Sequence, residues 1–158
     1  ASGDIIGKTT KERWIKNVNY VAEQSTNETF IPLAGTAENT NEANGAVAMV
    51  MPVNGKLLKV HLKTQIDHSG VTTTVKMYNW DVDEDHGGST DTLLGAQSAT
   101  GPATNAVGVF DFQSGLDSGT NVFTAGEMLA FSITNSSAVA SSCKYFVTLV
   151  FEMDWDSY

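Results

Sequence analysis

The sequence has little of what stabilises secreted proteins or anchors membrane proteins. It contains one cysteine, Cys143, in 158 residues, so no internal disulfide can form and the fold depends on its apolar core. No apolar run approaches the roughly twenty residues that a membrane helix needs, and residues 1–4 lack the charged and apolar regions of a signal peptide. We therefore expect a soluble protein that is made in a cytoplasm and makes no membrane contact.

Motifs of common enzymes are also missing. His61, His68 and His86 are far apart in sequence, and there is no metal-binding His pair, no Gly-x-Ser-x-Gly turn and no phosphate-binding glycine-rich loop. Cys143 has Lys144 beside it, which favours a thiolate, but a lone cysteine in a serine-rich loop is more often structural. We predict that the protein is not an enzyme and needs no cofactor, apart from the calcium site considered below.

The net charge of −9 is unevenly distributed along the chain. The first sixteen residues contain the basic residues Lys8, Lys11, Arg13 and Lys16. Only Asp4 and Glu12 oppose them, so this segment has a charge of +2 and the remainder has −11. Such an acidic body repels nucleic acid. We predict a basic N-terminal arm that docks on an acidic partner, with a solvated chain end as the alternative.

What the sequence does contain is a succession of short alternating segments separated by turn residues. In the last one, residues 145–155, large apolar side chains alternate with Thr148, Glu152 and Asp154, which is the period of two of a half-buried strand. Similar segments occur at residues 30–35, 46–51, 72–80, 92–97, 106–112 and 128–133. At residues 9–12 a capping-box pattern predicts a short helical turn that leads into a first strand.

Asn54 and Gly55 are typical of a type I′ hairpin turn, which would join residues 46–51 to the strand that follows. That second strand alternates as well. Its apolar face consists of Leu58, Val60, Leu62 and Ile66, and its polar face is a basic stripe of Lys59, His61 and Lys63.

About eight strands of this kind predict an all-β fold, a two-sheet antiparallel sandwich that is jelly-roll-like and limits its exposed edges. A lectin-like or immunoglobulin-like sandwich fits the same turns, and the strand order stays open. We divide the chain into residues 1–28, the basic N-terminal arm and first strand, and residues 29–158, a single β-sandwich domain.

The acidic segment after residue 80 is a candidate calcium site. Asp81, Asp83 and Asp85 have the one-three-five spacing of calcium loops, and hard cations favour such carboxylates. His86 and Thr92, however, stand where a helix-loop-helix calcium site needs glycine and glutamate. A solvated acidic hairpin tip is the alternative.

Glu152 and Asp154 form a second row of carboxylates on the last strand. Their spacing on one strand falls in the range of inverting glycosidases, but this means little without a cleft. Our hypothesis is that the row complements the stripe of Lys59, His61 and Lys63 on a neighbouring strand or subunit. Two solvated faces are the alternative.

Aromatic residues near strand ends have two interpretations. Trp14, Trp80 and Trp155 each lie beside polar loops, where buried anchors are the common explanation. In a carbohydrate-binding module, Tyr78 and Trp80, together with Tyr158, would instead be platforms on which sugar rings stack.

Four segments together resemble small β-rich virion proteins of marine tailed phages. They are Phe30-Ile-Pro-Leu-Ala-Gly-Thr-Ala-Glu38, Val50-Met-Pro-Val-Asn-Gly-Lys-Leu-Leu-Lys-Val60, Phe123-Thr-Ala-Gly-Glu-Met-Leu129 and the final strand, residues 146–155. In those proteins a strand-Pro-x-x-Gly-Lys/Arg-Leu turn and a late turn flank a sandwich. The similarity covers most of residues 30–155.

The resemblance implies a structural role at the virion surface, as a capsid decoration (cement) protein, a head fibre or a tail-associated piece. It implies a homotrimer bound to a capsid or tail structural protein, and no catalytic residues. Within that role we expect Trp14 and Ile15 to be apolar anchors of the basic arm. The alternative function is a receptor- or glycan-binding β-sandwich module of a tail or fibre tip, which would use Tyr78, Trp80 and the calcium loop.

Overall fold

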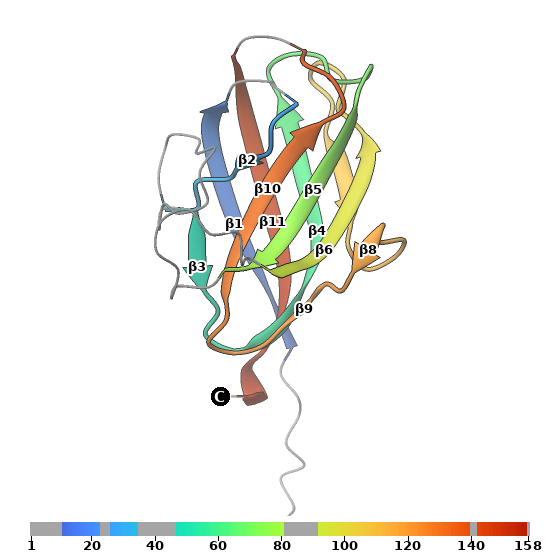
Figure 1. Cartoon of the computed structure of the whole chain (residues 1–158). Coiled ribbons are helices and arrows are strands. Elements are labelled where there is room, and N and C mark those ends of the chain that lie inside the picture. The colour runs from blue at the N-terminus through green and yellow to red at the C-terminus, as the bar shows by residue number, and fades with distance from the viewer. Residues whose placement is uncertain (1–10, 23–25, 35–46, 81–91, 140–141, 158) are drawn as a thin grey trace, which may run out of the picture.

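The structure is a computed structural model that describes residues 11–22, 26–34, 47–80, 92–139 and 142–157. Within these ranges it contains eleven β-strands and a single turn of 3-10 helix, η1 (Trp155–Ser157). The strands form two antiparallel sheets that pack face to face (Figure 1). The prediction of an all-β, two-sheet antiparallel sandwich is thus confirmed.

The order of the strands shows how the two sheets are built. The first sheet contains β1 (Lys11–Ala22), β11 (Cys143–Asp154), β4 (Asn54–Thr64) and β7 (Gly108–Asp111) in that order, and β9 (Val122–Phe123) also pairs with β4. The second contains β2 (Thr29–Phe30), β10 (Met128–Asn135), β5 (Thr72–Asn79), β6 (Thr92–Thr100) and β8 (Ser118–Gly119), with β3 (Ala48–Val50) also paired to β10. Consecutive strands lie in different sheets except for β2 with β3 and β5 with β6, which gives a jelly-roll-like sandwich.

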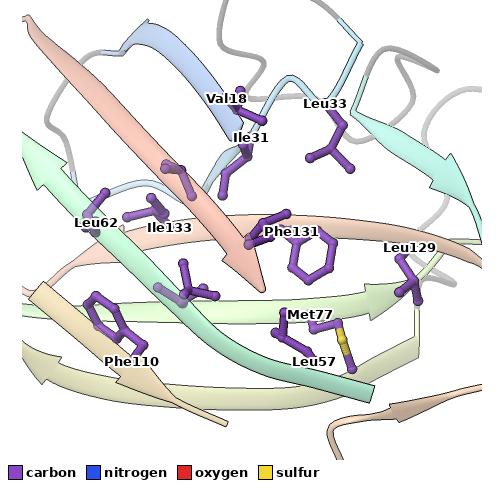
Figure 2. Packing of buried hydrophobic residues seen from close by; sticks show 14 of the residues in the cluster. Val18, Ile31, Leu33, Leu57, Leu62, Met77, Phe110, Leu129, Phe131 and Ile133 are labelled. Atoms are coloured by element: carbon purple, nitrogen blue, oxygen red, sulfur yellow. The ribbon is translucent and has the colours of Figure 1, made fainter. Parts of the chain in front are cut away.

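The core lies between the two sheets and follows the alternation seen in the sequence. Every second residue of β11 is buried, namely Cys143, Tyr145, Val147, Leu149, Phe151 and Met153. Figure 2 shows Leu57, Leu62 and Phe110 of the first sheet opposite Met77, Leu129 and Phe131 of the second. Trp155, which the pattern placed on the same face, is exposed because the strand ends at Asp154 and η1 begins.

Asn54 and Gly55 do not form the predicted hairpin turn. β3 pairs with β10 in the second sheet, whereas β4 begins at Asn54 in the first, so the chain crosses between sheets here. Gly55 has a packing role: a Cβ atom at this position would lie 2.5 Å from the carbonyl oxygen of Glu152 and 2.6 Å from the ring of Phe123. The Asn-Gly pair therefore marks close packing at the start of a strand.

The helical turn predicted at residues 9–12 is wrong in the part that is described, because Lys11 and Glu12 already belong to β1. β1 pairs with β11 along its whole length, from Lys11 opposite Asp154 to Ala22 opposite Cys143. The long β-branched and aromatic run after residue 12 favours this extended backbone over helix. Residues 11–16 of the predicted arm are thus part of the sandwich.

β1 forms an edge of the first sheet, since in the described part of the chain it is hydrogen-bonded to β11 alone. The ring of Trp14 packs on the ring of Phe151, with centroids 5.4 Å apart. Glu12 and Lys16 stand on either side of Trp14 on this core-facing side of the strand. Charged residues that point inward on an edge strand oppose the addition of a further strand. Pairing of two molecules through the β1 edge is therefore disfavoured.

A buried polar network closes the end of the sandwich where β11 begins. His68 is fully buried, with Nδ1 2.8 Å from the carbonyl oxygen of Ile66 and Nε2 3.3 Å from the hydroxyl of Tyr145. Asn135 donates to the same hydroxyl, and Thr73 donates to the side-chain oxygen of Asn135 over 2.8 Å. Buried polar groups that are paired in this way fix one arrangement of the strands.

Candidate interaction surface

Most of the predicted site residues that the structure describes lie on the solvent side of the first sheet. The register places the outward residues of β1 and β4 on either side of those of β11, because each alternates with a buried neighbour. We define the outer face by these residues: Lys11, Arg13, Ile15, Asn17, Asn19 and Val21 of β1; Lys144, Phe146, Thr148, Val150, Glu152 and Asp154 of β11; Lys56, Lys59, His61 and Lys63 of β4; Val109 and Asp111 of β7; and Val122 of β9.

The charge of the outer face is opposite to that of the chain. Six of the nine Lys and Arg residues of the sequence lie on it, namely Lys11, Arg13, Lys56, Lys59, Lys63 and Lys144. Its acidic residues, among those described, are Asp111, Glu152 and Asp154. Six positive and three negative groups give the face a charge of +3. Because the net charge of the whole sequence is −9, the rest of the sequence has a charge of −12. The fold thus gathers a basic surface on an acidic protein.

Glu152 has partners other than the ones we expected. Its Oε1 lies 3.5 Å from Nζ of Lys11 and 3.3 Å from Nζ of Lys56. The stripe of Lys59, His61 and Lys63 instead lies opposite Val150, Thr148 and Phe146, as the register shows. Contact of the stripe with the acidic row of another subunit stays a prediction.

A β-bulge in β4 explains why Lys56 lies opposite Glu152. The register shifts between Val150, opposite Lys59, and Phe151, opposite Leu57, so Leu58 is an extra residue. Leu57 and Leu58 are both buried, which two consecutive residues of a regular strand on a single-faced sheet would not be. The bulge brings Lys56 to the outer face opposite Glu152.

The other charged residues of the outer face are Asp111 and the cations that do not pair with Glu152. Asp111 accepts a hydrogen bond of 3.0 Å from the backbone N–H of Gln113, which lowers the pKa of Asp111 below its ordinary value, and the positive charge of Lys59 lowers it further. Within the described ranges, Arg13, Lys63 and Lys144 form no ion pair. These three cations are exposed to solvent and are available to a partner.

Apolar side chains are grouped on the same face. Of the ten large hydrophobic residues that are exposed in the described part of the chain, five belong to it: Ile15, Val21, Val109, Val122 and Phe146. Ile15 is 56% exposed and Phe146 is 42% exposed. Scattered apolar residues are common on protein surfaces, whereas a group on one face is typical of a binding surface.

Two hollows mark the ends of the outer face. One has a volume of about 310 Å³ and is lined by Asn19, Val21, Lys144 and Phe146, together with Tyr20 and Tyr145. The other, of about 270 Å³, lies where β9 meets β4 and is lined by residues that include Lys11, Lys56, Val122 and Glu152. Both mix charged and apolar side chains, as sites that receive the side chains of another protein do.

The predicted sugar platforms lie on the second sheet and are partly buried. Tyr78 and Trp80 pack against a small apolar cluster that includes Phe30, and the rings of Tyr78 and Phe30 are 5.7 Å apart. The hydroxyl of Tyr78 donates to Oε1 of Glu28 over 2.6 Å. Tyr78 is therefore half-buried and held in place by these contacts.

Glu28 collects three donors on this side of the molecule. Besides Tyr78, the hydroxyl of Ser132 donates to its Oε1, and Nζ of Lys76 lies 3.1 Å away. Desolvation alone would raise the pKa of Glu28, but the hydrogen bonds from Ser132, Tyr78 and Lys76 outweigh it and hold the pKa below its ordinary value. The carboxylate thus ties the segment before β2 to β5 and β10.

Several predicted residues fall outside the described ranges. These are the calcium ligands Asp81, Asp83 and Asp85, as well as Lys8 and Tyr158. In the described part of the chain, no three His, Cys, Asp or Glu residues are placed to hold a metal ion. None of the described residues belongs to a helix that is long and apolar enough to cross a membrane. Cys143 is buried, and its thiol donates to the carbonyl oxygen of Lys144 over 3.3 Å.

Sequence reasoning missed part of the outer face, namely Lys56, Lys144, Val109, Val122 and Phe146. The last strand did contain a signal, since Phe146 and Val150 are apolar residues at outward positions. The other members come from strands that are distant in sequence. Only the register brings them together.

No protein-family model and no curated protein matches the chain. Among solved structures, the VP2 subviral particle of infectious bursal disease virus is 10% identical with a TM-score of 0.49, over 94% of this chain and 34% of that one. A chain of the cyanophage Pam1 capsid asymmetric unit is 12% identical with a TM-score of 0.40, over 97% and 91% of the two chains. A chain of the Helicobacter pylori bacteriophage KHP30 capsid structure is 11% identical with a TM-score of 0.38, over 91% and 94%. The chain thus spans about a third of the VP2 chain that it matches.

Proposed function

We propose that the protein is a non-enzymatic structural protein of a virion, which assembles on the particle surface as a capsid decoration (cement) or head-fibre protein. The observation that supports this most is the outer face, where six basic and five exposed apolar side chains lie together on an otherwise acidic chain. A broad sheet surface of this composition suits another protein better than a small substrate. Its partners are other copies, as a homotrimer, and an acidic capsid or tail structural protein.

The residues of the predicted basic arm contribute to this function from within the sheet. Lys11, Arg13 and Ile15 point outward from β1, beside Glu152 and Asp154 of β11. Trp14 and Lys16 point to the other side of the strand. The attachment surface we propose is therefore a sheet face that is fixed before binding, so that little conformational entropy is lost when the partner docks.

Virion composition provides the direct test. Mass spectrometry of purified particles of the phage whose genome encodes the chain should detect it in many copies, and antibody labelling should place it on the exterior. Its absence from purified particles would refute the proposal.

Removal of residues 1–10 leaves β1 intact, whereas removal of residues 1–16 takes half of β1 from its pairing with β11. The shorter deletion therefore tests the segment before β1 while every described strand stays in the chain.

Glycan binding by a fibre tip is the alternative, and it is supported less well. The hydroxyl of Tyr78 is already bonded to Glu28, and its ring packs against Phe30. Trp80 is half-buried in the same cluster. Sugar stacking needs an open aromatic ring, and neither ring is fully open.

A further inference from the structure

We propose that one end of the outer face, where β11 begins, is the specific docking site for the partner protein. The part of the partner that docks there is a surface in which carboxylates surround a large apolar side chain. We call this end the basic end and define it by five outward residues: Asn19, Val21, Lys63, Lys144 and Phe146. The inference deepens the proposed function and rests on it for the identity of the partner as a virion protein.

The strand register brings these five residues together from three strands. Phe146 of β11 lies between Asn19 of β1 and Lys63 of β4. The next outward residue of β11, Lys144, lies opposite Val21. On one face of a sheet, Cβ atoms are about 5 Å apart across neighbouring strands and about 7 Å apart along a strand. An exposed aromatic ring thus has an amide on one side and a cation on the other, with a second cation next along the strand.

The acidic residues of the outer face all lie in its other half. Three acids and four cations are found there, which gives that half a charge of +1: Asp111, Glu152 and Asp154, with Lys11, Arg13, Lys56 and Lys59. Two of these cations, Lys11 and Lys56, already form ion pairs with Glu152. Negative charge on a partner therefore finds part of this half already neutralised.

The basic end has two cations and no acid among its residues, so its charge is +2. In the described part of the chain, Lys63 and Lys144 form no ion pair. Asp67, a described acid in the turn that follows β4, instead accepts a hydrogen bond of 2.8 Å from the backbone N–H of Ser69. Charge complementarity therefore favours the basic end for the carboxylates of a partner.

The hollow of about 310 Å³ supplies the apolar part of the site. Phe146 is 42% exposed and Val21 is 47% exposed, and both line this hollow together with Lys144 and Asn19. Beneath them Tyr20 and Tyr145 are buried and stacked, with ring centroids 5.3 Å apart. The hollow is thus formed before binding, and an apolar side chain that enters it loses little free energy to rearrangement of the site.

This composition favours a protein over an acidic polysaccharide. A polysaccharide could pair with Lys63 and Lys144, but its hydroxyl-rich surface would gain little from covering Val21. An apolar anchor surrounded by charged groups is the usual arrangement of a protein contact. Because only one end of the outer face attracts carboxylates strongly, the same arrangement also fixes the direction in which the partner lies across the sheet.

Particles that lack this chain, from a phage with its gene deleted, are the first probe. The purified full chain should rebind to them. The variant Lys63→Gln/Lys144→Gln should rebind at least about tenfold more weakly than Lys11→Gln/Lys56→Gln, which removes the same charge from the other half. Lys16→Gln, on the opposite side of β1, should rebind like the wild type.

A matched pair of valine variants tests the apolar part. Val21→Ser should weaken rebinding about fivefold, because the apolar contact in the hollow is lost. Val50→Ser should leave rebinding unchanged, because it removes a valine that is 62% exposed on β3 of the other sheet. Circular dichroism should show the same β signal for all variants.

A second measurement needs no particles. The isotope-labelled full chain is titrated with a short peptide of glutamates around one leucine and followed by nuclear magnetic resonance. The amide signals of Asn19, Lys144 and Phe146 should shift. Replacement of the leucine by serine should weaken binding about tenfold, because an apolar side chain is no longer buried. Alginate, an acidic polysaccharide, should bind more weakly than the leucine peptide.

Four results would overturn the inference. They are equal rebinding by the two double-lysine variants, a leucine peptide that shifts no amide of the basic end, equal affinity of the leucine and serine peptides, and tighter binding of alginate than of the leucine peptide. The last would make the basic end a site for acidic sugars. Particles to which both double variants rebind equally would leave the proposed function standing. A chain that binds the leucine peptide at the basic end but is absent from purified particles would refute the proposed function alone.

Discussion

Gly55 offers the sharpest test of how closely β4 packs against its neighbours β11 and β9. An added Cβ would lie 2.5 Å from the carbonyl oxygen of Glu152 and 2.6 Å from the ring of Phe123. The backbone oxygen cannot move without breaking the pairing of β11 with β4. The ring is buried and packs edge-on to Phe151, with centroids 5.9 Å apart. Neither neighbour can therefore give way easily.

We expect Gly55→Ala to lower the free energy of unfolding by about 2 to 3 kcal/mol, the upper part of the range for overpacking a well-filled site. Gly70→Ala is the matched control, because a Cβ there would meet no atom within 4 Å. Its free energy of unfolding should stay the same or rise by up to about 1 kcal/mol, since alanine restricts the unfolded chain.

Urea denaturation followed by tryptophan fluorescence measures both variants, since Trp14 packs against the core through Phe151. With a slope of about 2 kcal/mol per molar urea, the midpoint of Gly55→Ala should fall by about 1 to 1.5 M. Equal midpoints for the two alanine variants would refute the packing argument and would return Gly55 to the role of a simple turn residue.

Two further predictions concern polar groups. Glu28→Gln should lower the free energy of unfolding by about 1 to 2 kcal/mol at neutral pH, because Ser132, Tyr78 and Lys76 lose a charged acceptor. The pKa of Glu28 is lower in the folded state, so this stability is present above the unfolded pKa of about 4.3 and is lost as pH falls through the folded value. Denaturation curves of both proteins should therefore converge in acid, and a constant gap would contradict the assignment. Tyr145→Phe removes the hydroxyl shared by His68 and Asn135 and should cost about 1 to 2 kcal/mol in calorimetry, and an unchanged melting temperature would show that the network adds no stability.

The sequence predicted the fold class well because period-two alternation reports burial on one side of a strand. In β11 this pattern identified each inward residue from Tyr145 to Met153. It failed at Trp155, since the pattern holds no sign of where a strand ends. The separate prediction of a hairpin turn at Asn54 and Gly55 was wrong, because the same two residues favour a tight turn and permit close backbone packing.

The candidate surface was only partly predictable. Lys59, His61 and Lys63 were visible as a stripe because they alternate within one strand. The position of Lys56 on the same face depends on the bulge at Leu58, a single extra residue that the sequence periodicity does not indicate. Lys144 and Val109 could not be joined to them without the strand order, which links β7 to β4 and β4 to β11.

The pairing of Lys11 with Asp154 also determines how the molecule responds to a mechanical force. β1 begins and β11 ends at the same end of the sandwich (Figure 1). Tension between the first residue of β1 and the last residue of β11 would act along the ladder hydrogen bonds, which run perpendicular to the strands. The β1–β11 pairs would therefore open one after another. Tension passed through the outer face would be shared by several strands at once. The protein should therefore withstand pulling at its broad side far better than pulling by its two ends.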